Sequence, residues 1–190
     1  MQKNPAKYEE DIKMLRVTLL AGQEVGRGAL RTLTELGVSG RVVVAYDPET
    51  MLWGRRYGWS VYRTISHPAV RIALASSDIL ISVHGREIVS DELLALPVQG
   101  GLNLHPCLYG YPGSDPIGRW LQSGELWASV GAHRMTTQID RGPRIYEEGI
   151  KIIDRTDRAS VYRQLAPVYE RVLRIALNRI CVWETVDAQC

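Results

Sequence analysis

The stretch MLRVTLLAGQEVGRGALRTLTELGVSGRVVVAYD (residues 14–47) decides the fold. It begins with a buried strand that ends in glycine (14–22), continues with a helix closed by glycine (26–37), and finishes with a second apolar strand (41–47). A strand, a helix and a strand in this order predict two parallel strands joined by a crossover helix, which is the repeating unit of an α/β sheet.

The alternation of strands and helices continues along the chain. The next segments fit a helix (67–77), a buried strand (78–84), a helix with Ser90 as its N-cap (90–97) and a further strand (101–105). Together with the first stretch, this order is typical of a parallel sheet with helices on both faces. The sequence therefore predicts an α/β fold built on a doubly wound, mostly parallel, Rossmann-like sheet.

The segment between residues 47 and 67 is the least regular part of this pattern. Residues 60–64 are expected to be short and extended. They follow a loop that is rich in arginine and tryptophan and contains Trp53, Arg55, Arg56 and Trp59. Two interpretations stay open: the loop binds a ligand by stacking, or it is a solvated loop with packed aromatic rings.

The last third of the chain departs from the parallel pattern. After a helix (115–124), strands over 128–136 and 144–153 are expected to form an antiparallel pair, because the turn between them is short. Residues 155–183 predict a long C-terminal helix, which Pro167 should kink or split. The apolar stripe of this helix has helical spacing and comprises Leu165, Tyr169, Val172, Ala176 and Ile180.

The chain has 190 residues, enough for one domain with a full core, and no repeat or linker divides it. Residues 1–13 are expected to be a polar tail, either mobile or folded as a short polar helix, in front of a single domain over residues 14–190. The stripe on the last helix is expected to be core first and a homodimer contact second.

Composition is that of a soluble globular protein, with 45% hydrophobic and 23% charged residues. No apolar run reaches the ~18 residues of a membrane span, and the polar start of the chain lacks the apolar core of a secretory signal. The cysteines are three in number, without a CxxC pair: Cys107, Cys181 and Cys190. We expect a cytoplasmic protein without a membrane partner, and the net charge of +2 does not argue for nucleic acid.

Two polar residues lie at the end of the strand over 101–105. Because side chains alternate along a strand, Asn103 and His105 point to the same face, at the carboxyl end where doubly wound sheets bind ligands. An amide can hold a carbonyl oxygen, and an imidazole can move a proton or stabilise a developing oxyanion. The candidate for a carboxylate that orients the histidine is Asp140, in the turn between the last two strands.

The motifs around these residues resemble the formyltransferase domain of enzymes that use 10-formyltetrahydrofolate. The family includes glycinamide ribonucleotide, methionyl-tRNA and sugar N-formyltransferases. The matching motifs are Asn103-x-His105-Pro106, Tyr111-Pro112-Gly113-x-x-Pro116-Ile117, Gly131-x-His133 and Ile139-Asp140-x-Gly142-Pro143. Within this pattern, His133 is expected to pack in the sheet or to bond a neighbour.

The resemblance implies a role for each of the three polar residues. Asn103 would bind the formyl oxygen and stabilise the tetrahedral intermediate, while His105 would assist proton removal from the attacking amine. Asp140 would set the protonation of His105 and hold an ordered water. The reaction would be a direct acyl transfer from folate N10 to an amine.

The resemblance also places the co-substrate, 10-formyltetrahydrofolate. The segment VHGREIVSDELL (83–94) matches the stretch whose backbone holds the pterin ring in this family. The residues expected beside the pterin are Arg86, Glu87, Ile88 and Val89 on one side, and Gln138 and Ile139 on the other. No metal is expected, because the histidines lack metal-ligand spacing.

The acceptor is expected to be a small amine, and the residues expected to bind it are Gly22, His84, Tyr109 and Tyr111. The loop after His105 is shorter than the family motif, and the glycine loop AGQEVGRG (21–28) lacks the pattern that grips phosphate in glycinamide ribonucleotide enzymes. A nucleotide-linked amino sugar is the leading interpretation. Alternatives are glycinamide ribonucleotide, an amine of a siderophore or peptide pathway, hydrolysis of formyl-folate, or a catalytically silent folate- or nucleotide-binding module.

Overall fold

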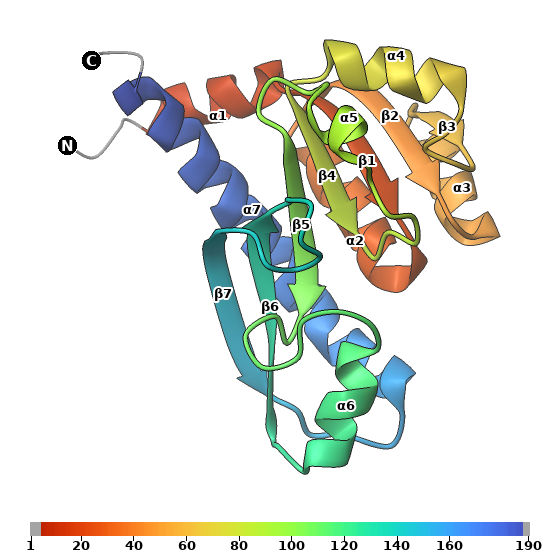
Figure 1. The fold of residues 1–190 in the computed structure, drawn as a ribbon, viewed down its shortest axis with the longest axis vertical. Helices are drawn as coiled ribbons and strands as arrows, with labels where there is room; N and C mark the ends of the chain where they lie inside the picture. Colours follow the sequence, from red (N-terminus) through yellow and green to blue (C-terminus); the bar gives the residue numbers. More distant parts are fainter. Residues whose placement is uncertain (1–4, 188–190) are drawn as a thin grey trace.

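A computed structural model describes residues 5–187, which fold around one seven-stranded sheet (Figure 1). Across the sheet the strands follow the order β3-β2-β1-β4-β5-β6-β7. The strands are β1 (Arg16–Ala21), β2 (Ser39–Ala45), β3 (Ser60–Tyr62), β4 (Ile79–Val83), β5 (Gly101–Pro106), β6 (Trp127–Arg134) and β7 (Arg144–Lys151). The pairs among β1 to β5 are parallel, whereas β6 runs antiparallel to both β5 and β7. The predicted doubly wound, mostly parallel sheet with an antiparallel pair is confirmed.

Helices connect the strands and cover the sheet (Figure 1). They are α1 (Pro5–Met14), α2 (Gln23–Glu35), α3 (Pro48–Arg56), α4 (Pro68–Ser76), α5 (Asp91–Leu94), α6 (Pro116–Ser123) and α7 (Arg158–Asp187). Of the two forms considered for the start of the chain, the structure has the short helix, α1, whose Ile12 is buried in the core. The third cysteine, Cys190, lies outside the described residues. Within the described range, no helix is long and apolar enough to cross a membrane.

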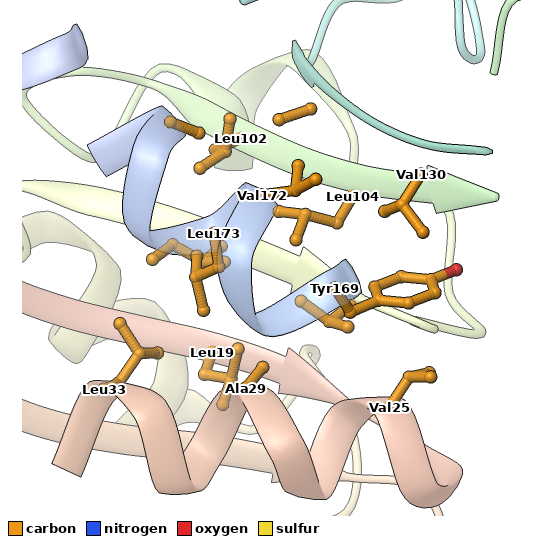
Figure 2. Close-up of a cluster of buried hydrophobic side chains, with 14 of the residues drawn as sticks. Leu19, Val25, Ala29, Leu33, Leu102, Leu104, Val130, Tyr169, Val172 and Leu173 are labelled. Carbon is orange, nitrogen blue, oxygen red and sulfur yellow. The ribbon is translucent and has the colours of Figure 1, made fainter. Parts of the chain in front are cut away.

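The long C-terminal helix is confirmed, but Pro167 does not split it. Helix α7 continues past Pro167 as one element, and the predicted apolar stripe, from Leu165 to Ile180, is fully buried. Figure 2 shows Tyr169, Val172 and Leu173 of this helix between the sheet and α2. The stripe therefore lies in the larger core. Its burial on both sides of Pro167 stabilises α7 as one helix despite the proline.

The segment predicted as an arginine- and tryptophan-rich loop is a helix, so that prediction is wrong. Asp47 caps α3 by accepting a hydrogen bond from the backbone N–H of Thr50 at 2.9 Å, and Pro48 stands in the first turn. Trp59 is buried and donates its indole N–H to the Thr34 hydroxyl at 2.9 Å. The interpretation as packed aromatic rings holds for Trp59. The sequence signals of this helix are its capping residue and its proline, and hydrophobic periodicity does not contain them.

The two faces of the sheet carry different cores, and this difference positions the site. Leu102 and Leu104 of β5 lie in the larger core with α2 and α7 (Figure 2). On the other face, α4 packs over β1 and β2 with a smaller core that includes Leu20 and Val70. Asn103 alternates with the two leucines and so faces away from α7. Beyond this smaller core, Ser82 of β4, Asn103 and His105 of β5 and His133 of β6 line a cavity.

The packing of α7 predicts a measurable loss of stability. Replacing the fully buried Leu173 with alanine should lower the free energy of unfolding by about 2–5 kcal/mol, because the change removes buried methyl groups and leaves a void between α7 and the sheet. Urea denaturation monitored by circular dichroism measures this change. The matched control is Leu52→Ala on the exposed side of α3, for which a loss as large as that of Leu173→Ala would contradict the packing described.

Candidate active site

A cavity of about 700 Å³ opens at the carboxyl ends of β4 and β5. Its walls come from distant parts of the chain: the segment after β4, the end of β5, the loop before α6, the turn between β6 and β7, and the start of α7. This is the edge at which parallel sheets bind ligands. The sequence prediction that Asn103 and His105 stand in such a crevice agrees with their position on its wall.

The structure brings Asn103, His105 and Asp140 together in one polar cluster. Asn103 Nδ2 donates to Asp140 Oδ1 at 3.1 Å, and His105 Nε2 lies 3.2 Å from Asp140 Oδ2. Each carboxylate oxygen therefore serves a different side chain of β5. Both side chains extend from the same face of that strand, as the period-two pattern predicts.

The turn that presents Asp140 has a constrained backbone. Asp140 itself has a positive φ of 54°, an unusual conformation for a residue with a side chain. A side chain at Gly142 would meet the carbonyl oxygen of Arg134 at 1.8 Å, so only glycine fits there. The turn is closed by bonds from Arg141 N to Gln138 O at 3.1 Å and from Arg134 N to Pro143 O at 2.9 Å. These constraints hold the Asp140 carboxylate beside Asn103 and His105 of β5.

His133 is a fourth member of the cluster. It is paired with Asn103 in the antiparallel register of β5 and β6, so both side chains lie on the same face. Its Nε2 lies 3.2 Å from Asn103 Nδ2 and 3.4 Å from Asp140 Oδ1. Its Nδ1 lies 2.9 Å from the carbonyl oxygen of Arg134, while Nε2 faces both Asn103 and Asp140 and accepts from the first or donates to the second according to the tautomer. The expectation that His133 bonds a neighbour is confirmed.

The loop between β5 and α6 closes over the cluster through the backbone of Gly113. Gly113 N donates to Asp140 Oδ2 at 2.9 Å, and its carbonyl oxygen lies 3.1 Å from His105 Nε2. Both atoms facing His105 Nε2 are acceptors, so this nitrogen carries a proton. Gly113 has a φ of +88°, which glycine adopts without strain. No side-chain pattern identified this contact, because the backbone makes it.

Burial and charge set the protonation of the cluster. Burial, which disfavours the charged imidazolium, lowers the pKa of His105 below its ordinary value, while the charge of Asp140 acts in the opposite direction. Burial would raise the pKa of Asp140, but the hydrogen bond to His133, the charge of His105 and the N–H of Gly113 outweigh it and lower that pKa. At neutral pH the site therefore combines an ionised carboxylate with a neutral imidazole.

Backbone strain concentrates around the cavity. The described residues other than glycine with positive φ are Gln23, His84, Cys107, Asp115 and Asp140. All of them except Cys107 line the cavity. Such conformations persist only where surrounding contacts enforce them, and they gather at functional sites.

Most residues predicted to hold the co-substrate are on the cavity wall. Arg86, Glu87, Ile88 and Val89 line one side, and Ile139 lines the other. Gln138 does not line the cavity, which corrects its predicted position. Its carbonyl oxygen instead accepts hydrogen bonds within the turn, from the Thr136 hydroxyl at 3.1 Å and from Arg141 N at 3.1 Å.

The residues predicted to bind the acceptor are mostly elsewhere. His84 lines the cavity and packs edge-on against Tyr162, but Gly22 lies behind it, with room for no side chain beside the His84 carbonyl. Tyr109 is 76% exposed and stacks on Arg144 beside a separate, smaller hollow. Tyr111 donates its hydroxyl to Glu125 at 2.7 Å and packs on the core. In place of these tyrosines, the end of the loop between β5 and α6, residues Gly113 to Pro116, lines the cavity.

Sequence reasoning missed the contribution of α7. Arg158 and Tyr162, from the first turns of this helix, line the cavity. The Arg158 guanidinium donates two hydrogen bonds to Asp115, at 2.9 and 2.6 Å, and so ties α7 to the start of α6. The two residues are 43 positions apart, and no local motif predicts their contact.

The start of α2 is already occupied by a carboxylate of the protein. Asp47 Oδ2 accepts a hydrogen bond from the backbone N–H of Gln23 at 2.7 Å, and Arg27 lies 3.5 Å from its other oxygen. A helix N-terminus attracts anions, and here Asp47 supplies the negative charge. Arg27 is paired with Glu49 as well, at 2.9 Å, so its charge is already balanced by two carboxylates.

The part of the chain that the structure describes contains no group of three or more His, Cys, Asp or Glu side chains placed to hold a metal ion. Cys107 and Cys181 are buried thiols. Burial raises the pKa of Cys107 to about 11, so this thiol is protonated at neutral pH and is a poor nucleophile.

Comparison with known proteins agrees with the geometry. The sequence model of the family described as "Formyl transferase" matches residues 66–177, which are 112 of the 190 residues. A curated relative, the bifunctional polymyxin resistance protein ArnA of Wigglesworthia glossinidia brevipalpis, is 37% identical over 114 residues. That match covers 60% of this chain, and it spans 17% of the length of the relative.

Solved structures share the fold. Glycinamide ribonucleotide transformylase 1 from Symbiobacterium toebii superimposes with a TM-score of 0.74 at 20% identity, over 89% of this chain and 88% of the other. A formyltetrahydrofolate deformylase from Pseudomonas putida superimposes with a TM-score of 0.69 at 16% identity, over 87% of this chain and 64% of the other. At these identities the likeness extends to the fold alone.

The protonation of His105 can be tested directly. Because burial disfavours its charged form, His105 should titrate below the ordinary value of 6.5. Asp140→Asn should lower the midpoint further, because the carboxylate that favours the imidazolium is lost. Histidine ring signals followed by NMR against pH measure both values. His67, which is exposed at the start of α4 and outside the cavity wall, is the internal control. A midpoint above 6.5 in the native protein, or a rise in the variant, would contradict the assignment.

Proposed function

The chain belongs to the formyl transferase family of folate-dependent enzymes, and on that premise we propose that it transfers a formyl group from 10-formyltetrahydrofolate to the amine of a small molecule. One observation carries the proposal: Asn103, His105 and Asp140 form a single hydrogen-bonded cluster on the wall of the cavity. An amide donor, a neutral imidazole and an ionised carboxylate are the groups that acyl transfer to an amine requires.

The chemistry follows from these three side chains. The acceptor amine attacks the formyl carbon, and the formyl oxygen becomes an oxyanion. Asn103 Nδ2 and the N–H of His105 are the donors that stabilise it, in place of their present partners His133 and Gly113. The bond from carbon to N10 then breaks, and the proton lost by the amine is transferred to N10 of tetrahydrofolate. Asp140 keeps its charge and holds the two donors, Asn103 Nδ2 and the N–H of His105, in position.

The folate is proposed to lie between two walls of the cavity. Arg86 to Val89 form one wall, and the turn from Thr136 to Asp140 forms the other. The backbone groups of these segments are available to hydrogen-bond a pterin ring. A ring held there would present N10 and its formyl group toward Asn103 and His105, which stand between the walls. The acceptor would enter from the side of Gln23, His84 and Tyr162.

The acceptor is proposed to be a nucleotide-linked amino sugar. The relative that matches at 37% identity is a polymyxin resistance protein, whereas the likeness to glycinamide ribonucleotide transformylases concerns the fold alone. The carboxylate of Asp47 at the start of α2 also disfavours an acceptor with a phosphate at that point. An amine of a siderophore or peptide pathway and water, which would make the protein a formyl-folate hydrolase, are the other acceptors to test.

The reaction can be tested by incubating the protein with 10-formyltetrahydrofolate and a panel of nucleotide-linked amino sugars, with products detected by mass spectrometry. Asn103→Ala should lower kcat by about 10²–10³, the usual cost of losing one oxyanion donor. Ile72→Ala, on the exposed side of α4, is the control and should leave kcat unchanged. If no amine is formylated and no folate binds, the proposed function fails, and release of formate without an amine would identify a hydrolase.

The role of Asp47 gives a test of acceptor class. The native protein should use glycinamide ribonucleotide poorly, because its phosphate would meet the Asp47 carboxylate at the start of α2. Asp47→Asn keeps a side chain that can cap α3 and removes the charge, so kcat/KM for this substrate should rise about tenfold. Steady-state kinetics measure the ratio. Efficient use of glycinamide ribonucleotide by the native protein would instead favour that substrate over an amino sugar.

A further inference from the structure

Glu87 was predicted to contact the co-substrate, but its carboxylate is committed to the protein. Its Oε1 accepts from the Thr64 hydroxyl at 2.6 Å, and its Oε2 accepts from the Tyr46 hydroxyl and from Ile65 N, both at 2.9 Å. Burial would raise the pKa of Glu87, but these three bonds outweigh it and lower that pKa. Glu87 is therefore a carboxylate at neutral pH, with both oxygens turned toward other elements.

The three donors belong to segments that are held against the sheet by backbone bonds and core packing. Tyr46 directly follows β2, and its N–H bonds to the carbonyl of Ala21 at 3.1 Å. Thr64 and Ile65 connect β3 to α4, and the Ile65 side chain is buried in the smaller core. Glu87 thus links the segment after β4 to the residue after β2 and to the connection between β3 and α4.

The anchor fixes the position of the next residue, Ile88, on the cavity wall. Ile88 is 80% exposed, although Glu87 before it is tied down and Val89 after it is buried in the smaller core. Because the residues on both sides are fixed, the position of Ile88 on the cavity wall is fixed as well. The exposed side chain of Ile88 therefore offers apolar surface that a ligand in the cavity can cover.

The opposite wall repeats this arrangement. Ile139 is 58% exposed, lines the same cavity, and is followed directly by Asp140, which Asn103 and Gly113 hold in place. Each wall thus presents one exposed isoleucine beside one anchored carboxylate. The faces of a flat ring between the walls would cover both side chains, while its edge would meet the backbone.

We propose that Glu87 is a positioning residue for the folate site: it anchors the wall that carries Ile88, and so sets the affinity for the co-substrate without taking part in formyl transfer. The inference rests on the proposed function. It predicts that loss of the carboxylate releases the segment, weakens folate binding, and leaves the chemistry at Asn103 and His105 unchanged once folate is bound.

Two variants separate an anchor from a general effect on folding. Glu87→Ala removes all three bonds. Glu87→Gln can keep them, because an amide oxygen still accepts from Tyr46 and Ile65 N, and the Thr64 hydroxyl can accept from the amide NH2. Glu92→Ala is the matched control, since it removes an exposed glutamate from α5 on the same side of the cavity, outside its wall.

The measurement is steady-state kinetics with 10-formyltetrahydrofolate varied and the acceptor saturating. Glu87→Ala should raise KM for the folate by about tenfold and leave kcat within about twofold. Glu87→Gln should restore KM to within about threefold of the native value, and Glu92→Ala should not change it. A fall in kcat at unchanged KM, or a native KM in a folded Glu87→Ala protein, would overturn the proposal.

Hydrogen–deuterium exchange without any ligand separates this inference from the proposed function. The amides of residues 85–90 should exchange faster in Glu87→Ala than in the native protein, while those of β5 should not. Unchanged exchange at residues 85–90 would show that Glu87 does not hold the segment, whatever the enzyme does. If the native protein binds no folate, the proposed function fails, and the folate role of Glu87 fails with it.

Discussion

The carboxylate of Asp140 is the group on which the site depends. It is almost enclosed, and a buried charge is tolerated only with partners that satisfy it. Its partners come from three places: Asn103 and His105 on β5, His133 on β6, and the backbone of Gly113 in the loop that precedes α6. One negative charge thus joins two strands, a loop and a turn, and the cluster exists only when all of them are in place.

The sheet makes room for this cluster by dividing its two faces. The leucines of β5 face α7, whose buried stripe fills the larger core, while the alternate side chains face a region that α4 leaves open. The same strand therefore supplies buried core residues on one face and a polar cavity wall on the other. The cavity is thus formed by the part of one sheet face that none of the described helices covers, while the opposite face is packed against α2 and α7.

Partly buried carboxylates recur as anchors around the cavity. Asp140 holds the turn between β6 and β7, Glu87 holds the segment after β4, and Asp47 joins the starts of α2 and α3. Each accepts at least one backbone N–H, so each fixes main chain rather than only a neighbouring side chain. Fixed main chain is what a site needs if its walls are to meet a planar ligand without the cost of ordering loops.

Apart from α3, the sequence by itself determined the order of strands and helices. It also determined the common direction of Asn103 and His105 and the family, because these follow from local periodicity and from short, contiguous motifs. It did not determine that the carboxylate of Glu87 bonds to Tyr46 and the connection after β3, that Tyr109 and Tyr111 lie outside the cavity wall, or that Arg158 and Tyr162 belong to it. The direction of a loop side chain and the meeting of residues 43 positions apart depend on how the elements pack. Local sequence carries no signal for these contacts, and only the tertiary structure decided them.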